Sequence, residues 1–101
     1  MTNEIELYYD TNFKKKVEGK IEFSPVVAEE ETKKELYIFN NLDYKVNLIL
    51  ELEGEMVELV EKELSIEPKT IKPIHFILNP KKTSLKPITA NIKIKLNYIV
   101  V

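Results

Sequence analysis

The chain lacks several residue types on which protein chemistry often depends. Its 101 residues contain no cysteine, no tryptophan and no arginine, and only one histidine and two glycines. Without cysteine, disulfides and thiolate metal sites are excluded. Two glycines are too few to build a loop that cradles a phosphate group. Arginine is the preferred residue for bidentate contacts to phosphate and guanine, so its absence argues against specific nucleic-acid recognition.

The residues that could support catalysis are isolated from one another in the sequence. His75 lies between Ile74 and Phe76, so in a strand it points away from the apolar face. A lone histidine without a cysteine, a second histidine or a nearby aspartate predicts neither a metal site nor the base of a triad. No serine lies in the Gly-x-Ser-x-Gly motif of a nucleophile elbow. We therefore predict no enzymatic activity, no cofactor, no metal and no small-molecule substrate.

Long hydrophobic runs are also missing from the chain. Every apolar run is much shorter than the roughly 20 residues that span a bilayer. The opening MTNEIELYYD has no basic region before an apolar run, so we expect neither a signal peptide nor membrane binding. We expect a single domain over residues 1–101, located in the cytoplasm or within a viral particle.

The clearest positive feature is an alternation of apolar and polar residues near the C-terminus. In ITANIKIKLNYIVV, apolar residues occupy every even position from Ile88 to Val100, and polar residues fill the odd positions as far as Asn97. A period of two predicts a strand with one face on the core and the other in water. In this phase we expect Leu96 to be a core residue. Residues 44–52 show the same alternation, and in its phase we expect Leu50 to be a core residue.

Similar patterns recur along the rest of the chain. The run MVELVEKEL fits a short strand or one face of a helix, and we favour the strand because its neighbours are β. Residues 28–35 are highly charged, which predicts a solvated connector. The spacing predicts an all-β, immunoglobulin-like antiparallel sandwich of seven or eight strands. Besides the C-terminal strand, the predicted strands lie near residues 5–9, 17–23, 36–39, 44–52, 64–66 and 74–78.

Charge is divided unevenly between two neighbouring segments. Residues 51–67 contain seven glutamates and one lysine, whereas residues 68–101 contain seven lysines and no acidic residue. One interpretation is that the two segments form adjacent strands whose outer faces complement each other. The other is a dipolar surface that orients docking or self-association.

Several short motifs give the chain a resemblance to a known type of domain. They are IEFSPV, LYIFNN, YKVNLIL and LSIEPKTIKPIHFILNP, in which the matching positions are Phe23-Ser24-Pro25, Asn40, Leu64 with Pro68, and Phe76 with Pro80. With them, residues 19–80 resemble immunoglobulin-like domains of the ASPM/SPD-2/Hydin and major-sperm-protein type. The chain departs from that pattern at Ala28 and Lys69, where such domains often carry glycine. The resemblance implies scaffolding and protein binding without catalytic residues. Small immunoglobulin-like subunits of phage particles look similar in size and composition.

The C-terminal end carries the candidate interaction residues. After Asn97 the alternation stops, and Tyr98, Ile99, Val100 and Val101 place apolar groups on both faces. Such a strand needs cover on both faces, and an open apolar edge invites pairing with another chain. Either the N-terminal strand, residues 5–9, covers it within the molecule, or a neighbouring subunit does so by packing or strand addition.

These observations predict a non-catalytic structural or protein-interaction module. We expect protein partners or self-association, as a small subunit of a larger assembly such as a virion. The alternative is a glycan- or surface-binding sandwich module. In that case Tyr8, Tyr9 and Tyr44 would provide a stacking platform for sugar rings.

Overall fold

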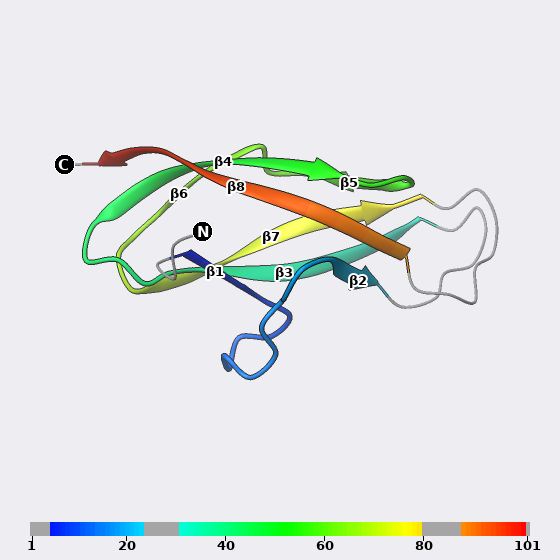
Figure 1. The fold of residues 1–101 in the computed structure, drawn as a ribbon, viewed down its shortest axis with the longest axis horizontal. Coiled ribbons are helices and arrows are strands. Elements are labelled where there is room, and N and C mark those ends of the chain that lie inside the picture. The colour runs from blue at the N-terminus through cyan, green and yellow to red at the C-terminus, as the bar shows by residue number, and fades with distance from the viewer. Residues whose placement is uncertain (1–4, 24–30, 80–87, 101) are drawn as a thin grey trace.

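The computed structural model describes residues 5–23, 31–79 and 88–100, and these residues form a β-sandwich (Figure 1). The described residues contain no helix, and so no helix that is long and apolar enough to cross a membrane. Their strands are β1 (Ile5–Tyr8), β2 (Ile21–Phe23), β3 (Thr32–Asn40), β4 (Lys45–Glu53), β5 (Val57–Leu59), β6 (Glu63–Ile66), β7 (Thr70–Leu78) and β8 (Ile88–Val100).

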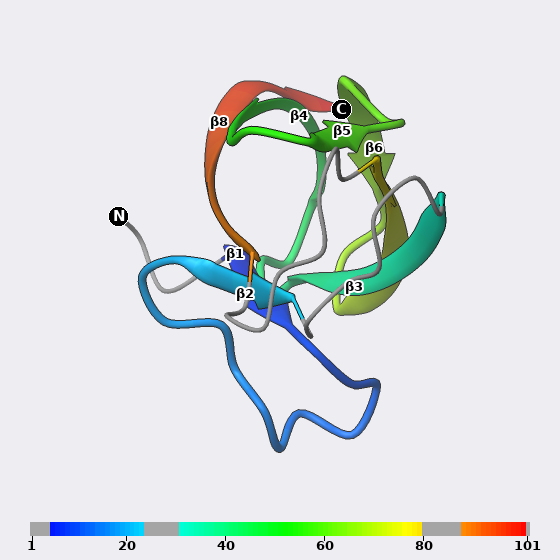
Figure 2. The same cartoon turned by 90° about the vertical axis from the view of Figure 1, so that its right-hand side faces the viewer.

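The strands form two four-stranded sheets. One sheet has the order β1-β3-β7-β5 and the other has the order β2-β8-β4-β6. Every pairing between neighbouring strands is antiparallel. Figure 2, which looks along the length of the sandwich, shows β8 and β4 on one side of the interior and β3 on the other. The predicted fold class, an all-β antiparallel sandwich compatible with an immunoglobulin-like domain, is therefore confirmed.

The core lies between the sheets and is built from alternate residues of the long strands. Leu36 and Ile38 of β3 face Leu48 and Leu50 of β4 across an interior in which all four are buried. Leu50, predicted as a core residue, is 2% exposed, which confirms its placement. Burying one side chain of this size stabilises the fold by about 1.5–3 kcal/mol relative to leaving it exposed. The buried residues of the long strands therefore hold the two sheets together.

Two sequence predictions differ from the structure in detail, and a third is confirmed. Residues 32–35 lie in β3 instead of a solvated connector, because they pair with residues 75–78 of β7. The strand expected over residues 17–23 is limited to β2, since Val17 is outside it and Gly19 adopts a positive φ of 72°. The ambiguous run MVELVEKEL contains β5 and the first two residues of β6, so the favoured short strand is confirmed. Ala28, Ser24-Pro25 and Pro80 lie outside the described residues.

The prediction that Leu96 is a core residue is wrong, since its side chain is 54% exposed. Leu96 pairs with the buried Leu48, so it lies on the inner side of its sheet, but at a point that the opposite sheet does not cover. The next pair is Asn47 with Tyr98, which leaves Asn97 as the extra residue of a β-bulge. Because a bulge shifts the alternation by one residue, Tyr98 lies on the outer face and Ile99 on the inner one.

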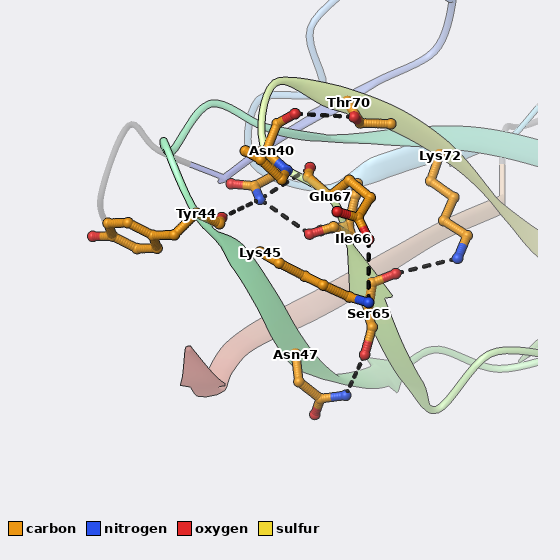
Figure 3. Close-up of polar contacts among 10 residues, drawn as sticks. Asn40, Tyr44, Lys45, Asn47, Ser65, Ile66, Glu67, Thr70 and Lys72 are labelled. Carbon is orange, nitrogen blue, oxygen red and sulfur yellow. Dashed lines mark hydrogen bonds and ion pairs between the residues drawn. The ribbon is translucent and has the colours of Figure 1, made fainter. Parts of the chain in front are cut away.

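A buried asparagine fixes the end of the sandwich where β3 leads into β4 (Figure 3). The Asn40 Nδ2 group donates to the carbonyl oxygens of Tyr44 at 3.0 Å, and of Ile66 and Glu67 at 3.2 Å each. Its Oδ1 accepts a hydrogen bond from the Leu42 N–H at 3.0 Å. Asn40 therefore ties the β3–β4 connection to the end of β6.

The turn that follows β6 contains a lysine in a backbone conformation that favours glycine. Lys69 has a φ of 55°, in the left-handed region that β-carbon sterics disfavour. The Lys69 Nζ group donates to the backbone oxygen of Asn41 at 2.7 Å. The side chain of Lys69 thus links this turn to the β3–β4 connection.

The charged segments lie on adjacent strands, in agreement with the interpretation of complementary outer faces. Glu51 of β4 pairs with Lys93 of β8, and Glu53 pairs with Asn91. Lys95 Nζ lies 3.2 Å from Glu51 Oε1, and Lys93 Nζ lies 4.0 Å from Glu53 Oε1. Exposed ion pairs of this kind contribute about 0–1 kcal/mol each, so they add little to the stability of the fold.

Candidate functional site

The C-terminal part of β8 forms an open sheet edge. On one side β8 pairs with β4 as far as Val100. On the other side β2 pairs only with residues 88–90. Within the described ranges no further strand pairs with this side, so residues 91–100 present an open edge. Figure 1 shows this part of β8 running with β4 toward the C-terminus, well past β2.

The register shows which backbone groups of β8 point away from the sheet. The Leu50 N–H of β4 donates to the Lys62 carbonyl, on the β6 side. In an antiparallel sheet, alternate residues bond to opposite neighbours, so Ile49 and Glu51 bond to β8. Their partners on β8 are Lys95 and Lys93. It follows that Ile92, Ile94 and Leu96 direct their N–H and C=O groups to the open side. This is the side on which β2 pairs with residues 88–90.

The predicted interaction residues lie at the end of this edge. Tyr98 is 52% exposed and Ile99 is 43% exposed, and Val100 is partly buried. Val101 lies outside the described residues. The alternative in which the N-terminal strand covers this end does not hold for the described part of that strand. β1 pairs with β3 in the other sheet, while Tyr98 and Ile99 remain exposed.

Nearer the middle of β8, the edge borders an apolar cleft of about 270 Å³. The cleft lies between β1, which is the edge strand of one sheet, the open stretch of β8 in the other sheet, and the segment that follows β1. Ile92 and Ile94 line it from β8, so their inner faces remain only partly covered. Its other lining residues are Ile5, Leu7, Lys16, Val17 and Gly19.

A polar cluster on the outer face holds the bulge in place. Asn97 Nδ2 donates to Asn47 Oδ1 at 2.9 Å. Asn47 Nδ2 in turn donates to Ser65 Oγ at 2.9 Å and to Glu63 Oε2 at 3.2 Å. Asn47 is only 3% exposed, so its amide is buried with partners for both of its ends. These contacts were not predicted from the sequence, although the single polar residue in the run VNLIL was a signal for them.

A second cluster, on the other sheet, surrounds the only histidine. As predicted, His75 is exposed, but it does not lack acidic neighbours. Its Nδ1 lies 2.6 Å from Glu61 Oε2, and its Nε2 lies 3.3 Å from Glu35 Oε1. The His75 backbone N–H donates to Glu61 Oε1 at 2.7 Å. Glu35 is the direct cross-strand partner of His75, so pairing between β3 and β7 creates this contact.

The contact between His75 and Glu61 shifts their two pKa values in opposite directions. The hydrogen bond to Glu61 is the main cause that raises the pKa of His75 above its ordinary value of 6.5. Burial acts to raise the pKa of Glu61, but hydrogen bonds from the backbone and ring of His75 outweigh it and hold that pKa below 4.5. The charged pair is therefore favoured in the folded state.

We expect His75→Gln to weaken the pH dependence of stability in the neutral range. A raised histidine pKa contributes stability that is complete below about pH 6.5 and is lost as the pH rises through the higher folded-state value. The lowered pKa of Glu61 acts in the opposite range, where its contribution is lost as the pH falls below about 4.5. Urea unfolding at pH 5.5 and pH 8.5 should therefore show a larger alkaline loss for wild type than for His75→Gln. Identical losses would contradict a folded-state shift.

The structure does not bring together the tyrosines of the predicted sugar platform. Tyr8 is buried, and its ring packs edge-on against Phe13. Tyr9 is partly buried, and its hydroxyl oxygen accepts a hydrogen bond from the Glu22 N–H. Tyr44 is exposed, but it lies near the other end of β1. It follows Asn40, which pairs with Ile5 at the start of β1, whereas Tyr8 is at the end of that strand. The alternative platform therefore has no common surface.

Two further findings bear on function. Within residues 5–23, 31–79 and 88–100, no group of three or more histidine, cysteine, aspartate or glutamate side chains is arranged to hold a metal ion. No family model, no curated protein and no solved structure matches the chain. The resemblance to immunoglobulin-like domains of known families thus stays a prediction.

Proposed function

We propose that this protein is a non-catalytic interaction module that binds another polypeptide along the open edge of β8. In this proposal it works as a small structural subunit of a larger assembly, such as a viral particle. The observation that supports it most is that β8 combines outward backbone groups at Ile92, Ile94 and Leu96 with exposed apolar side chains at its C-terminal end. Those side chains belong to Leu96, Tyr98 and Ile99.

The length of the edge distinguishes it from the other sheet edges. Proteins usually limit unwanted pairing by keeping edge strands short. β2 has three residues and β5 has three, while β1 and β6 have four each. The open stretch of β8 covers residues 91–100, which is long enough for several main-chain hydrogen bonds with an added strand. Strand addition gains affinity from those bonds and specificity from alternate side chains.

The proposal is tested by a variant that removes one backbone donor from the edge. Leu96→Pro deletes an N–H that points to the open side, and proline is tolerated on an edge for this reason. Leu96→Ala is the matched control, since it removes the exposed side chain but keeps the N–H. Peptides of ten residues, selected from a random library on the wild-type protein, should bind Leu96→Pro at least tenfold more weakly than Leu96→Ala.

The readout is fluorescence anisotropy with labelled peptides, after circular dichroism has shown that both variants keep their β spectrum. Equal binding to the two variants would place the interaction elsewhere and would contradict a docking role for this edge. A library that gives no binding peptide would also count against the proposal.

A further inference from the structure

The open edge and the apolar cleft form one continuous surface. Ile92 and Ile94 contribute backbone groups to the edge and side chains to the cleft. Directly paired residues in a sheet place their side chains on the same face. A strand added at this edge would therefore direct alternate side chains toward the cleft, where Ile5 and Leu7 provide the opposite wall. Its remaining side chains would lie on the outer face, beside Lys93 and Lys95.

The outer face of the edge is basic. Lys93 and Lys95 expose 62% and 58% of their side chains, and residues 91–100 contain no acidic residue. Each lysine forms an ion pair with a glutamate of β4 on one side, and among the described residues neither has an ion-pair partner on the side of the open edge. Opposite charges on directly paired residues stabilise a sheet by about 0.2–1 kcal/mol each, and like charges destabilise it.

This charge pattern disfavours a second copy of the chain as the occupant. Two β8 edges related by a two-fold axis pair antiparallel. If the register is centred on Ile94, Lys93 of each copy lies opposite Lys95 of the other. Shifting the register by two residues in either direction sets one of these lysines opposite its own counterpart. In these three registers the lysines disfavour self-pairing, while the apolar side chains of the same stretch favour the addition of another strand.

We propose that the occupant of this edge is an extended segment of a different protein in which apolar residues alternate with aspartate or glutamate. Its apolar side chains enter the cleft beside Ile92 and Ile94, and its carboxylates lie next to Lys93 and Lys95. This inference rests on the proposed function, because it names the chemistry of the partner at the same edge.

Two synthetic peptides of ten residues separate the chemistry of the partner from the use of the edge. One alternates valine with glutamate and the other alternates valine with lysine, so their backbones and apolar faces are the same. On the full-length wild-type chain we expect the glutamate peptide to bind at least tenfold more tightly, measured by fluorescence anisotropy. Raising the ionic strength should reduce that difference, because exposed charges are screened.

Charge reversal on β8 provides the decisive comparison. The double variant Lys93→Glu/Lys95→Glu should reverse the preference toward the lysine peptide. The double variant Lys33→Glu/Lys62→Glu changes the net charge equally at exposed positions of other segments, and it should keep the preference of the wild type.

Each alternative outcome has a distinct meaning. If both peptides bind equally and Leu96→Pro abolishes both interactions, docking at the edge stands and the acidic partner is overturned. If neither peptide binds while library peptides still require the edge, the acidic partner is again overturned and the proposed function survives. If sedimentation shows a wild-type dimer that Leu96→Pro dissociates, the occupant is a second copy and the inference is wrong.

Discussion

Replacing Asn40 with alanine is expected to lower the free energy of unfolding by about 3 kcal/mol. The side chain is fully buried and makes hydrogen bonds to three backbone carbonyls and one backbone N–H. A typical hydrogen bond contributes about 0.5–1.5 kcal/mol, and a buried group left without its partner costs about 1–3 kcal/mol. The loss is large because the Ile66 carbonyl bond lies inside the protein, where water does not replace the amide.

Asn41→Ala is the matched control. Asn41 is exposed, and its side-chain oxygen accepts one hydrogen bond, from Lys69 Nζ at 3.0 Å. Its removal should cost less than 1 kcal/mol, as is usual for surface substitutions. Urea unfolding with an unchanged m-value measures both variants on the same scale. If Asn40→Ala loses no more free energy of unfolding than Asn41→Ala, the Asn40 amide does not hold the β3–β4 connection to the end of β6.

The long strands could be predicted from the sequence because burial imposes a period of two on them. β4 and the first part of β8 follow that period, and their even positions face the core. β3 begins earlier than predicted, since residues 32–35 are polar and gain strand structure only by pairing with β7. A pattern within one segment carries no information about a partner strand about 40 residues away.

The phase of β8 after Leu96 depends on a contact between distant residues. Asn97 and Asn47 are 50 positions apart, and their side-chain hydrogen bond accompanies the bulge that shifts Tyr98 to the outer face. The acidic partners of His75 come from Glu35 and Glu61, which only the register and the β5–β6 connection bring close. These features arise from tertiary pairing, so alternation alone did not predict them.

The candidate site could be predicted in part. Apolar residues on both faces after Asn97 indicated an exposed end, and Tyr98 and Ile99 are indeed exposed. The open backbone edge could not be predicted from the sequence, because it depends on how far β2 extends along β8. β2 ends at Phe23 after three residues. The cleft beside Ile92 and Ile94 also depends on the position of β1, in the other sheet.

Leu50→Ala is expected to lower the free energy of unfolding by about 2–5 kcal/mol, because it removes a buried side chain and leaves a cavity. That is a large share of the roughly 5–15 kcal/mol of a typical small domain. Leu96→Ala, by contrast, should cost under about 1 kcal/mol, the usual range for a surface position. The sequence pattern alone treats the two leucines alike, whereas their exposures are 2% and 54%.

Chemical unfolding of both variants in the same denaturant tests this difference. Leu50 pairs with Ile94 and Leu48 pairs with Leu96, so the two substitutions probe neighbouring points of one sheet. A much larger loss for Leu50→Ala would show that the core covers β4 at this point of the sheet but not β8 beside it, where the open edge is accessible. Equal losses would mean that Leu96 is packed in the interior, and a strand added at that point would then have no exposed apolar surface to bind.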